Sequence, residues 1–510
     1  MEDRENGARH THPETGGRDP APNGRIGDHP ILEFDRGRRV RFDLDGRPLD
    51  GYESETIAAA LHASGVRVLR RSIRHERPRG FFCAIGRCSS CLMTVDGVPN
   101  VMTCVTPLRG GMRVETQRGK GVIADPAAPL PGADRIGTAR DLGAVPLVVI
   151  GAGPAGLSAA IAAGRLGVSS LVVDENRTPG GQLIKQTHMF FGSREHHARV
   201  RGIDIGKKLV AELEDLPVEL LLDTTALGLY PGRTVSLLRD GAHMKIRAEA
   251  VVLAAGASEN MLAFEGCDLP GVYGAGAVQT LMNVHGVSPG RRVLMVGAGN
   301  IGLIVSYQLL QAGVEVAAVI DALPEIGGYH VHAAKIRRAG VPVLTSHTIV
   351  RALGTESVEA AAVCEVDSDW APVPGTERTF DVDTICLAVG LTPNCELALQ
   401  SGCESAYLPE LGGHVVVHGE DLETTLPGVY IAGDASGIEE ASTAMLEGRL
   451  AGLAAARAMD PGIDSAEIDR SLGEAAAGLA ELRGGPFGEK PRVGKSRMGE
   501  LARERRRESP

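Results

Sequence analysis

Two glycine-rich turns, each set between an apolar run and an apolar helical segment, constrain the fold of this chain most. The first follows residues 147–150 and reads Gly151-x-Gly153-x-x-Gly156. In such a turn the first glycine permits the tight bend, the second lets a pyrophosphate approach the backbone, and the third lets helix pack on strand. A second apolar run ends at Asp174, where an acid can bind ribose hydroxyls. The stretch therefore predicts a βαβ dinucleotide-binding unit.

The same fingerprint occurs again after the apolar run 293–296. It reads Gly297-x-Gly299-x-x-Gly302, and its second predicted strand ends at Asp321. An acid at that point favours the free 2′-hydroxyl of NAD, and no arginine follows at once to take the 2′-phosphate of NADP. The fingerprint alone leaves open whether this second fold binds NAD(H).

Composition narrows the class of protein. The 510 residues include 53 Lys and Arg against 64 Asp and Glu, for a net charge of −11, which argues against nucleic acid as a partner. No apolar run approaches the ~20 residues of a membrane-spanning helix, and we expect no membrane span. Of nine cysteines, four cluster at 83–104 and the others are scattered, which favours a reducing cytoplasm over a secreted disulfide framework.

The four clustered cysteines have the spacing of an iron–sulfur site. Cys83-x4-Cys88-x2-Cys91 is followed by Cys104, a spacing typical of plant-type [2Fe–2S] binding. Three thiolates on one loop can surround two irons only if backbone amides turn inward, and the small residues between the cysteines permit this. A zinc site is the alternative, although zinc sites favour Cys-x2-Cys pairs.

Several arginines precede this loop: Arg70, Arg71, Arg74, Arg77 and Arg79. We interpret them as a solvated face. The alternative is that they offset the negative charge of a cluster or dock an acidic partner.

A family resemblance covers the cysteine region. Residues 38–118, including the segment Pro107-x3-Gly111-Met112, resemble the amino-terminal [2Fe–2S] domain of sarcosine oxidase alpha subunits. They are also similar to the small iron–sulfur subunit of hydrogen cyanide synthase.

A second resemblance covers residues 146–458, which are similar to thioredoxin reductase-like and glutathione reductase-like flavoproteins. It implies FAD on the first fold, contacted at Gly181 and Gln182, and a second FAD motif at Gly433 and Asp434. In that superfamily the second fold binds a nicotinamide nucleotide. No closely spaced cysteine pair lies near the flavin motifs, so a dithiol-exchange reductase is nearly excluded.

These patterns predict an α/β protein with two nested dinucleotide-binding (Rossmann-like) domains after a small α+β ferredoxin-like (β-grasp) domain. The predicted limits are a disordered tail 1–30, the [2Fe–2S] domain 31–118, a linker 119–145, the FAD-binding domain 146–287 and 377–458, the NAD(P)-binding-like domain 288–376, and a mobile tail 459–510. We expect the linker to be the only join between the cluster domain and the flavoprotein.

Two functions remain open. The first is the electron-transferring alpha subunit of a heteromeric amine, amino-acid or opine dehydrogenase, whose beta-type flavoprotein partner oxidises a small substrate. The second is a self-sufficient NADH-dependent reductase that passes single electrons to an acceptor. The first is favoured because the resemblance spans both regions.

No catalytic residue follows from the sequence. One unusual segment carries His188, Phe190, Phe191, Arg194, His196 and His197. Its histidines could serve acid–base chemistry or bind metal, but no carboxylate or cysteine lies at clear ligand spacing. We therefore favour a surface or docking loop.

Overall fold

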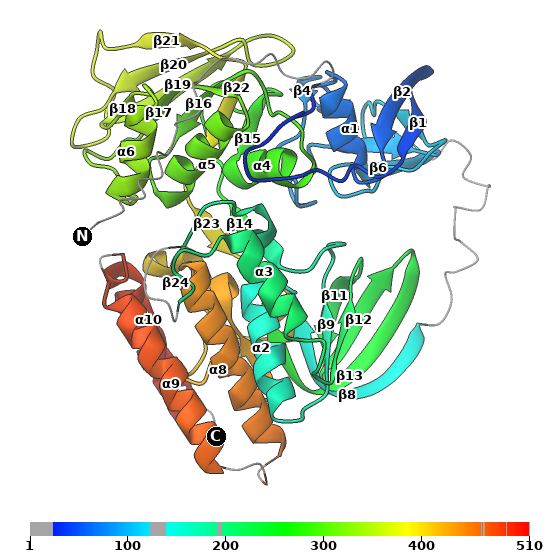
Figure 1. Cartoon of the computed structure of the whole chain (residues 1–510), viewed down its shortest axis with the longest axis vertical. Coiled ribbons are helices and arrows are strands. Elements are labelled where there is room, and N and C mark those ends of the chain that lie inside the picture. Colours follow the sequence, from blue (N-terminus) through cyan, green and yellow to red (C-terminus); the bar gives the residue numbers. More distant parts are fainter. Residues whose placement is uncertain are drawn as a thin grey trace, which may run out of the picture.

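The computed structural model describes residues 24–122, 139–190, 196–460, 462, 465–485 and 487–508. Over these ranges the chain forms a small amino-terminal domain and two dinucleotide-binding folds, with long helices beside the first of them (Figure 1). The predicted fold class is confirmed. In the same ranges, every helix is too short or too polar to cross a membrane.

The amino-terminal domain is a five-stranded sheet with one short helix, in the order β2-β1-β7-β5-β6. Strand β1 alternates exposed and buried side chains, as a half-buried strand does, and runs parallel to β7. The elements are β1 (Arg39–Leu44), β2 (Arg47–Tyr52), α1 (Ile57–Ala63), β3 (Arg70–Arg71), β4 (Pro78–Arg79), β5 (Leu92–Val95), β6 (Val98–Met102) and β7 (Arg113–Glu115).

The first dinucleotide fold has a sheet in the order β10-β9-β8-β13-β12-β11, and β26 also pairs with β13. Its central strands are parallel and rich in Val, Leu and Ile, as suits strands covered on both faces. The elements are β8 (Arg140–Ile150), α2 (Pro154–Arg165), β9 (Ser170–Val173), α3 (Gly202–Ala211), β10 (Val218–Leu221), β11 (Thr225–Tyr230), β12 (Thr234–Arg239), β13 (Ala242–Leu253), β26 (Val429–Ile431) and α8 (Ala441–Met459).

The second fold has a parallel sheet in the order β15-β22-β16-β17-β18, beside a three-stranded sheet of β19, β20 and β21. Its elements are β15 (Val272–Gly274), α4 (Ala275–Gln279), β16 (Arg292–Val296), α5 (Asn300–Gln311), β17 (Glu315–Ile320), α6 (His330–Arg338), β18 (Val343–Leu344), β19 (His347–Leu353), β20 (Ala360–Glu365), β21 (Arg378–Asp381) and β22 (Thr384–Leu387). The predicted limits 288–376 are too narrow, because β15 and β22 lie outside them and pair within this sheet.

Short elements connect the two folds. Strands β14 (Ala257–Glu259) and β23 (Leu391–Pro393) pair with each other, as do β24 (Ser405–Leu408) and β25 (Gly413–Val416). Helix α7 (Glu396–Ser401) lies between β23 and β24 in the chain. The segments β14 and β23 thus mark the two crossings between the folds.

The amino-terminal domain shares one hydrophobic core with the second fold. Phe42 and Leu61 of the first belong to the same buried cluster as Tyr273 and Met295 of the second, and the two units lie side by side in Figure 1. The expectation that a linker alone joins the cluster domain to the flavoprotein is therefore wrong. Extensive apolar burial holds the two together.

The limits of the linker and of the first tail also need correction. Strand β8 begins at Arg140, inside the predicted linker 119–145, whose residues 123–138 lie outside the described ranges. In the predicted tail 1–30, residues 1–23 also lie outside them, but Arg25 is fixed by an ion pair of 2.7 Å with the buried Glu55.

The predicted mobile tail 459–510 is wrong over its described part. It forms two helices, α9 (Ser465–Arg483) and α10 (Glu489–Glu508), which lie beside α8 in Figure 1. Met498 and Ala502 of α10 are buried against Leu411. The charge of this segment suggested a solvated tail, but Arg483 and Lys495 form ion pairs with an acid of α8 in the first fold.

Candidate redox site

The four predicted cluster cysteines come together. Hydrogen-bonding contacts pair Cys83 with Cys88 and Cys91 with Cys104, and a further contact joins Cys83 to Cys104. The loop between the first three is tight, because its backbone passes through the left-handed region at Ala84, Gly86 and Ser89. The structure thus places four sulfurs, from two separate segments, around one position.

Backbone groups turn toward these sulfurs, as the spacing predicts. The main chain of Ile85 and Arg87 bonds to Cys83, and that of Ser90 to Cys88. Hydrogen bonds from Cys104 and Cys88 are the chief reason that the pKa of the Cys83 thiol lies well below its ordinary value. Backbone amides of the loop therefore donate to sulfur, and amides placed in this way stabilise the thiolates that both a zinc ion and an iron–sulfur cluster require.

The four sulfurs by themselves leave both a zinc ion and an iron–sulfur cluster open. Among the described residues, no group of three or more His, Cys, Asp or Glu side chains is arranged to hold one metal ion.

The interpretation of the arginines before the loop as a solvated face holds for the exposed Arg74 but not for Arg71 and Arg79. Arg71 pairs with Glu356, and Arg79 pairs with Asp268 at 2.6 Å. Both acids belong to the second fold or to the segment leading into it. These arginines therefore dock the cluster domain on the rest of the same chain.

The first glycine turn has room for no side chain at its two ends. Gly151 has φ of 107°, and a Cβ there would lie 2.3 Å from the carbonyl oxygen of Ala254. A Cβ on Gly156 would lie 1.8 Å from the carbonyl oxygen of Gly151. Steric contact thus explains why the motif needs glycine at both positions.

The predicted flavin-contacting turn lies against this glycine turn. Gly181 begins the short turn η2 (Gly181–Lys185), and a Cβ on it would lie 2.7 Å from the Cα of Gly153. The side chain of Gln182 is exposed beside this contact. The two turns together form a backbone cradle, and a pyrophosphate could approach its amide groups closely.

Asp174 lies at the end of β9, as predicted, and helps to close the turn. Its Oδ2 accepts the amide of Ala152 at 2.6 Å, and its Oδ1 accepts the amide of Asn176 at 2.7 Å. Both carboxylate oxygens of Asp174 thus hold backbone amides next to the glycine turn.

The predicted second FAD motif reaches the same place. Gly433 begins the turn η5 (Gly433–Ser436) after β26, and a Cβ on it would lie 2.8 Å from that of Ala155 in α2. Gly433 and Asp434 therefore lie beside the first glycine turn, although that turn precedes them by some 280 residues in the chain. Burial raises the pKa of Asp434 to about 7.

A buried acid that the sequence reasoning missed fixes this turn. Glu447 of α8 is 2% exposed and accepts the amide of Gly433 at 3.0 Å and the hydroxyl of Ser436 at 2.6 Å. Arg483 of α9 and Lys495 of α10 form ion pairs with it at 2.6 and 2.7 Å. Burial opposes its ionisation, but the two cations outweigh burial and hold its pKa below the ordinary value.

The second glycine turn repeats the first in detail. A Cβ on Gly297 would lie 2.3 Å from the carbonyl oxygen of Ala388. A Cβ on Gly302 would lie 1.9 Å from the carbonyl oxygen of Gly297. Asp321 accepts the amide of Ala298 at 2.6 Å, and nothing lies within 4 Å of the Cβ position of Gly299. The second turn thus has the same backbone construction as the first.

The three histidines of the unusual segment do not converge. His188 stacks on Phe190 and faces His332 of α6, and burial lowers the pKa of His188 to about 4. His196 and His197 instead line a hollow of about 380 Å³ between α2, α3, α8 and α9. Phe191 and Arg194 lie outside the described residues.

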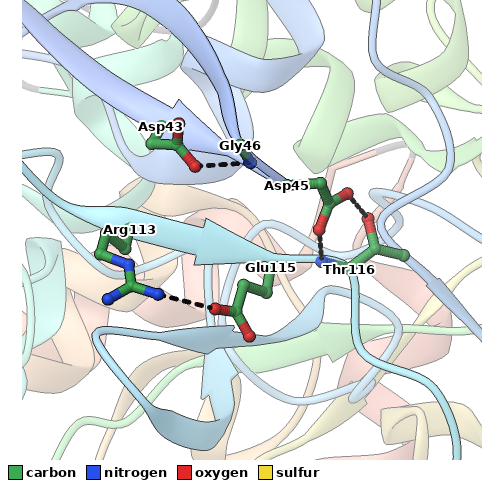
Figure 2. A pocket seen from close by; sticks show the side chains of 6 residues that line it. All are labelled: Asp43, Asp45, Gly46, Arg113, Glu115 and Thr116. Carbon is green, nitrogen blue, oxygen red and sulfur yellow. Dashed lines mark hydrogen bonds and ion pairs between the residues drawn. The ribbon is translucent and has the colours of Figure 1, made fainter.

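A hollow of about 620 Å³ on the amino-terminal domain is unrelated to the cysteines (Figure 2). Its acids serve local structure, since Asp43 accepts the amide of Gly46 and Asp45 accepts both the amide and the hydroxyl of Thr116. None of the four cysteines lines it, so it is not part of the candidate site.

Two family models match the chain. The family described as pyridine nucleotide-disulphide oxidoreductase matches residues 145–448, and the 2Fe-2S iron-sulfur cluster binding domain matches residues 37–119. The second match contains all four clustered cysteines and decides for [2Fe–2S] over zinc.

Among curated proteins, the alpha subunit of sarcosine oxidase from Rhizobium meliloti (strain 1021) is 29% identical over 81% of this chain and 45% of its own. An opine oxidase subunit from Agrobacterium tumefaciens (strain Ach5) is 31% identical over 61% of this chain and 65% of its own. The HcnB subunit of hydrogen cyanide synthase from Pseudomonas protegens is 27% identical over 60% of this chain and 69% of its own. The chain spans less than half the length of the sarcosine oxidase subunit.

Solved structures show the same fold. L-proline dehydrogenase from P. horikoshii superposes with a TM-score of 0.66 at 23% identity, over 88% of this chain and 79% of that one. Thioredoxin reductase from T. acidophilum superposes with a TM-score of 0.51 at 19% identity, over 62% of this chain and 98% of that one.

Proposed function

Because the chain belongs to the pyridine nucleotide-disulphide oxidoreductase family, we propose that it is the electron-transferring alpha subunit of a heteromeric amine, amino-acid or opine dehydrogenase. It is an FAD-dependent oxidoreductase that also carries a [2Fe–2S] cluster. FAD supplies two-electron chemistry when bound, and the cluster supplies one-electron chemistry. The partner and the substrate class are the proposed part.

The observation that carries this proposal is the contact between the cysteine loop and the first fold. Arg87 of the loop donates to the side-chain oxygen of Asn394, and the amide nitrogen of Asn394 donates to the carbonyl oxygen of Ala255 at 2.8 Å. Ala255 follows Ala254, which contacts Gly151 of the glycine turn. The two cofactor sites are thus linked within one chain, as transfer of electrons between them requires.

We assign the site residues on this basis. The cluster ligands are Cys83, Cys88, Cys91 and Cys104. The FAD residues are Gly151, Gly153, Gly156, Asp174, Gly181, Gln182, Gly433 and Asp434. The open space beside Gly153 and Gly299, where a Cβ would meet no atom closer than 3.9 Å, fits the close approach of a pyrophosphate to the backbone.

A second flavoprotein subunit is the proposed partner, and a small amine, amino acid or opine the proposed substrate. The support is that the relatives are by name subunits of sarcosine and opine oxidases. All nine cysteines are unpaired, which is in keeping with the predicted cytoplasmic location.

The isolated chain, loaded with FAD and cluster, is expected to be inert toward sarcosine, proline and opines. Substrate oxidation needs a pocket that desolvates the amine, and aromatic side chains are few in this chain. Anaerobic incubation with each amine, followed by flavin absorbance, measures this. Stoichiometric bleaching by any of them would overturn the subunit proposal, and dithionite bleaching is the control for a functional flavin.

The alternative, an NADH-dependent reductase, is favoured by the construction of the second glycine turn. Its cradle matches that of the first fold at the glycines and at Asp321. Rapid mixing of the loaded chain with NADH separates the two functions. Prompt flavin bleaching supports the reductase, whereas the subunit proposal does not require it.

Replacement of Asp174 by alanine is expected to weaken FAD binding by about 1–3 kcal/mol, because it removes an acceptor for the ribose and leaves the Ala152 amide unpaired. Flavin content and the dissociation constant of the apoprotein measure the loss. Asp321→Ala is the matched control, since Asp321 holds the equivalent amide in the second turn. An Asp321 variant that loses flavin while Asp174→Ala keeps it would reverse the assignment of the two folds.

A further inference from the structure

Lys185 is a buried cation that lies outside every sequence motif described above. It ends the turn η2, which begins at the flavin-contacting Gly181, and its side chain is 7% exposed. Its ammonium group makes no hydrogen bond or direct ion pair with the described residues. Its main chain is fixed, because its carbonyl oxygen accepts the side-chain amide of Asn283 at 2.7 Å. A buried ammonium group without a direct partner is stable as a cation only if opposite charge lies nearby.

Opposite charge comes from Glu259 and from the cysteine loop. Burial lowers the pKa of Lys185 to about 8, while the charges of Glu259 and Cys83 act in the other direction. Glu259 ends β14, and its Oε1 accepts the amide of Gly276 at 2.6 Å. The acid is therefore held at a fixed position, and although burial raises its pKa, the charge of Lys185 acts against that rise.

The same acid adjoins the residue before the first cluster cysteine. The amide of Gly274 donates to the carbonyl oxygen of Phe82 at 3.2 Å. A Cβ on Gly274 would lie 2.2 Å from Oε2 of Glu259. Since Cys83 follows Phe82, one contiguous set of contacts runs from the cysteine loop to Glu259. Lys185, whose charge acts on both Glu259 and Cys83, lies at the end of the flavin-contacting turn.

We infer that the fixed charges of Lys185 and Glu259 together set the reduction potential of the [2Fe–2S] cluster. The inference rests on the proposed cluster and FAD sites. One-electron reduction adds one negative charge to the cluster. A fixed cation nearby favours that electron and a fixed anion opposes it, and buried charges are screened little by salt.

The test is an anaerobic redox titration of the full chain, loaded with FAD and cluster, at neutral pH. The electron paramagnetic resonance signal of the reduced cluster gives its potential. Lys185→Met is expected to shift the potential to more negative values, and Glu259→Gln to less negative values. The double variant is expected to return close to the wild-type potential, and Lys185→Arg, which keeps the charge, to stay there.

Lys245→Met is the matched control, because Lys245 is half-exposed on β13 and pairs with Asp141 at 3.3 Å. Shifts no larger than that of the control, or shifts of the two single variants in the same direction, would overturn the inference. If Lys185→Met does not assemble a cluster, Glu259→Gln and Lys185→Arg still decide it. A wild-type chain with no reduced-cluster signal would instead refute the proposed cluster itself.

Discussion

Replacement of Glu447 by alanine is expected to lower the free energy of unfolding by about 3–5 kcal/mol, because breaking a buried ion pair leaves uncompensated charge. Lys495, with its side chain 9% exposed, would lose its ion pair, whereas Arg483, 16% exposed, would keep its second pair with Glu439. The amide of Gly433 would lose its acceptor as well. We therefore expect the second FAD motif to loosen and flavin to be released more readily. Chemical denaturation and the rate of flavin release measure the two effects.

Glu474→Ala is the matched control for this variant. Glu474 pairs with Arg449 of the same helix α8, but their side chains are 55% and 38% exposed. Exposed pairs contribute about 0–1 kcal/mol, so the control should be close to the wild type. Equal stability of the two variants would contradict the role assigned to Glu447.

The contribution of Glu447 also fixes the direction of a pH effect. Its pKa in the folded protein lies below the ordinary value of 4.5. Its stabilisation is therefore complete above that value and is lost as the pH falls below it, when the folded state must take up the proton. The stability difference between the wild type and Glu447→Ala should shrink over that acid range.

Replacement of Cys104 by serine is expected to abolish the cluster, because a serine hydroxyl is a poor substitute for a thiolate ligand. FAD is expected to stay bound. The reason is not a flexible linker, since the cluster domain shares a core with the second fold. It is that the FAD cradle is built from the first fold alone, at Gly151, Gly181 and Gly433.

The iron content and the electron paramagnetic resonance spectrum of the dithionite-reduced variant measure this loss, and flavin absorbance measures retention of FAD. Cys364→Ser is the matched control, because Cys364 and Cys104 are both 3% exposed and Cys364 lies on β20, away from the cluster loop. Retention of a wild-type cluster signal in Cys104→Ser would refute the ligand assignment. Loss of flavin together with iron would show that the two sites depend on each other.

The sequence by itself determined the parts of this protein that depend on local steric or ligand requirements. Only glycine fits at Gly151 and Gly156, because a Cβ would collide with the backbone, and that requirement leaves a fixed spacing in the chain. The spacing of the four cysteines is set in the same way by the size of the cluster. Short-range constraints of this kind can be recognised without knowing what lies elsewhere in the molecule.

Only the tertiary structure decided which charged residues are buried and paired. Arg483 and Lys495 belong to a segment whose composition suggests a solvated tail, and Arg71 and Arg79 suggest a solvated face. Each of these residues instead forms an ion pair with an acidic residue that is distant in the sequence. The energy of such a pair depends on the burial that both partners reach together, and composition and spacing do not encode that burial.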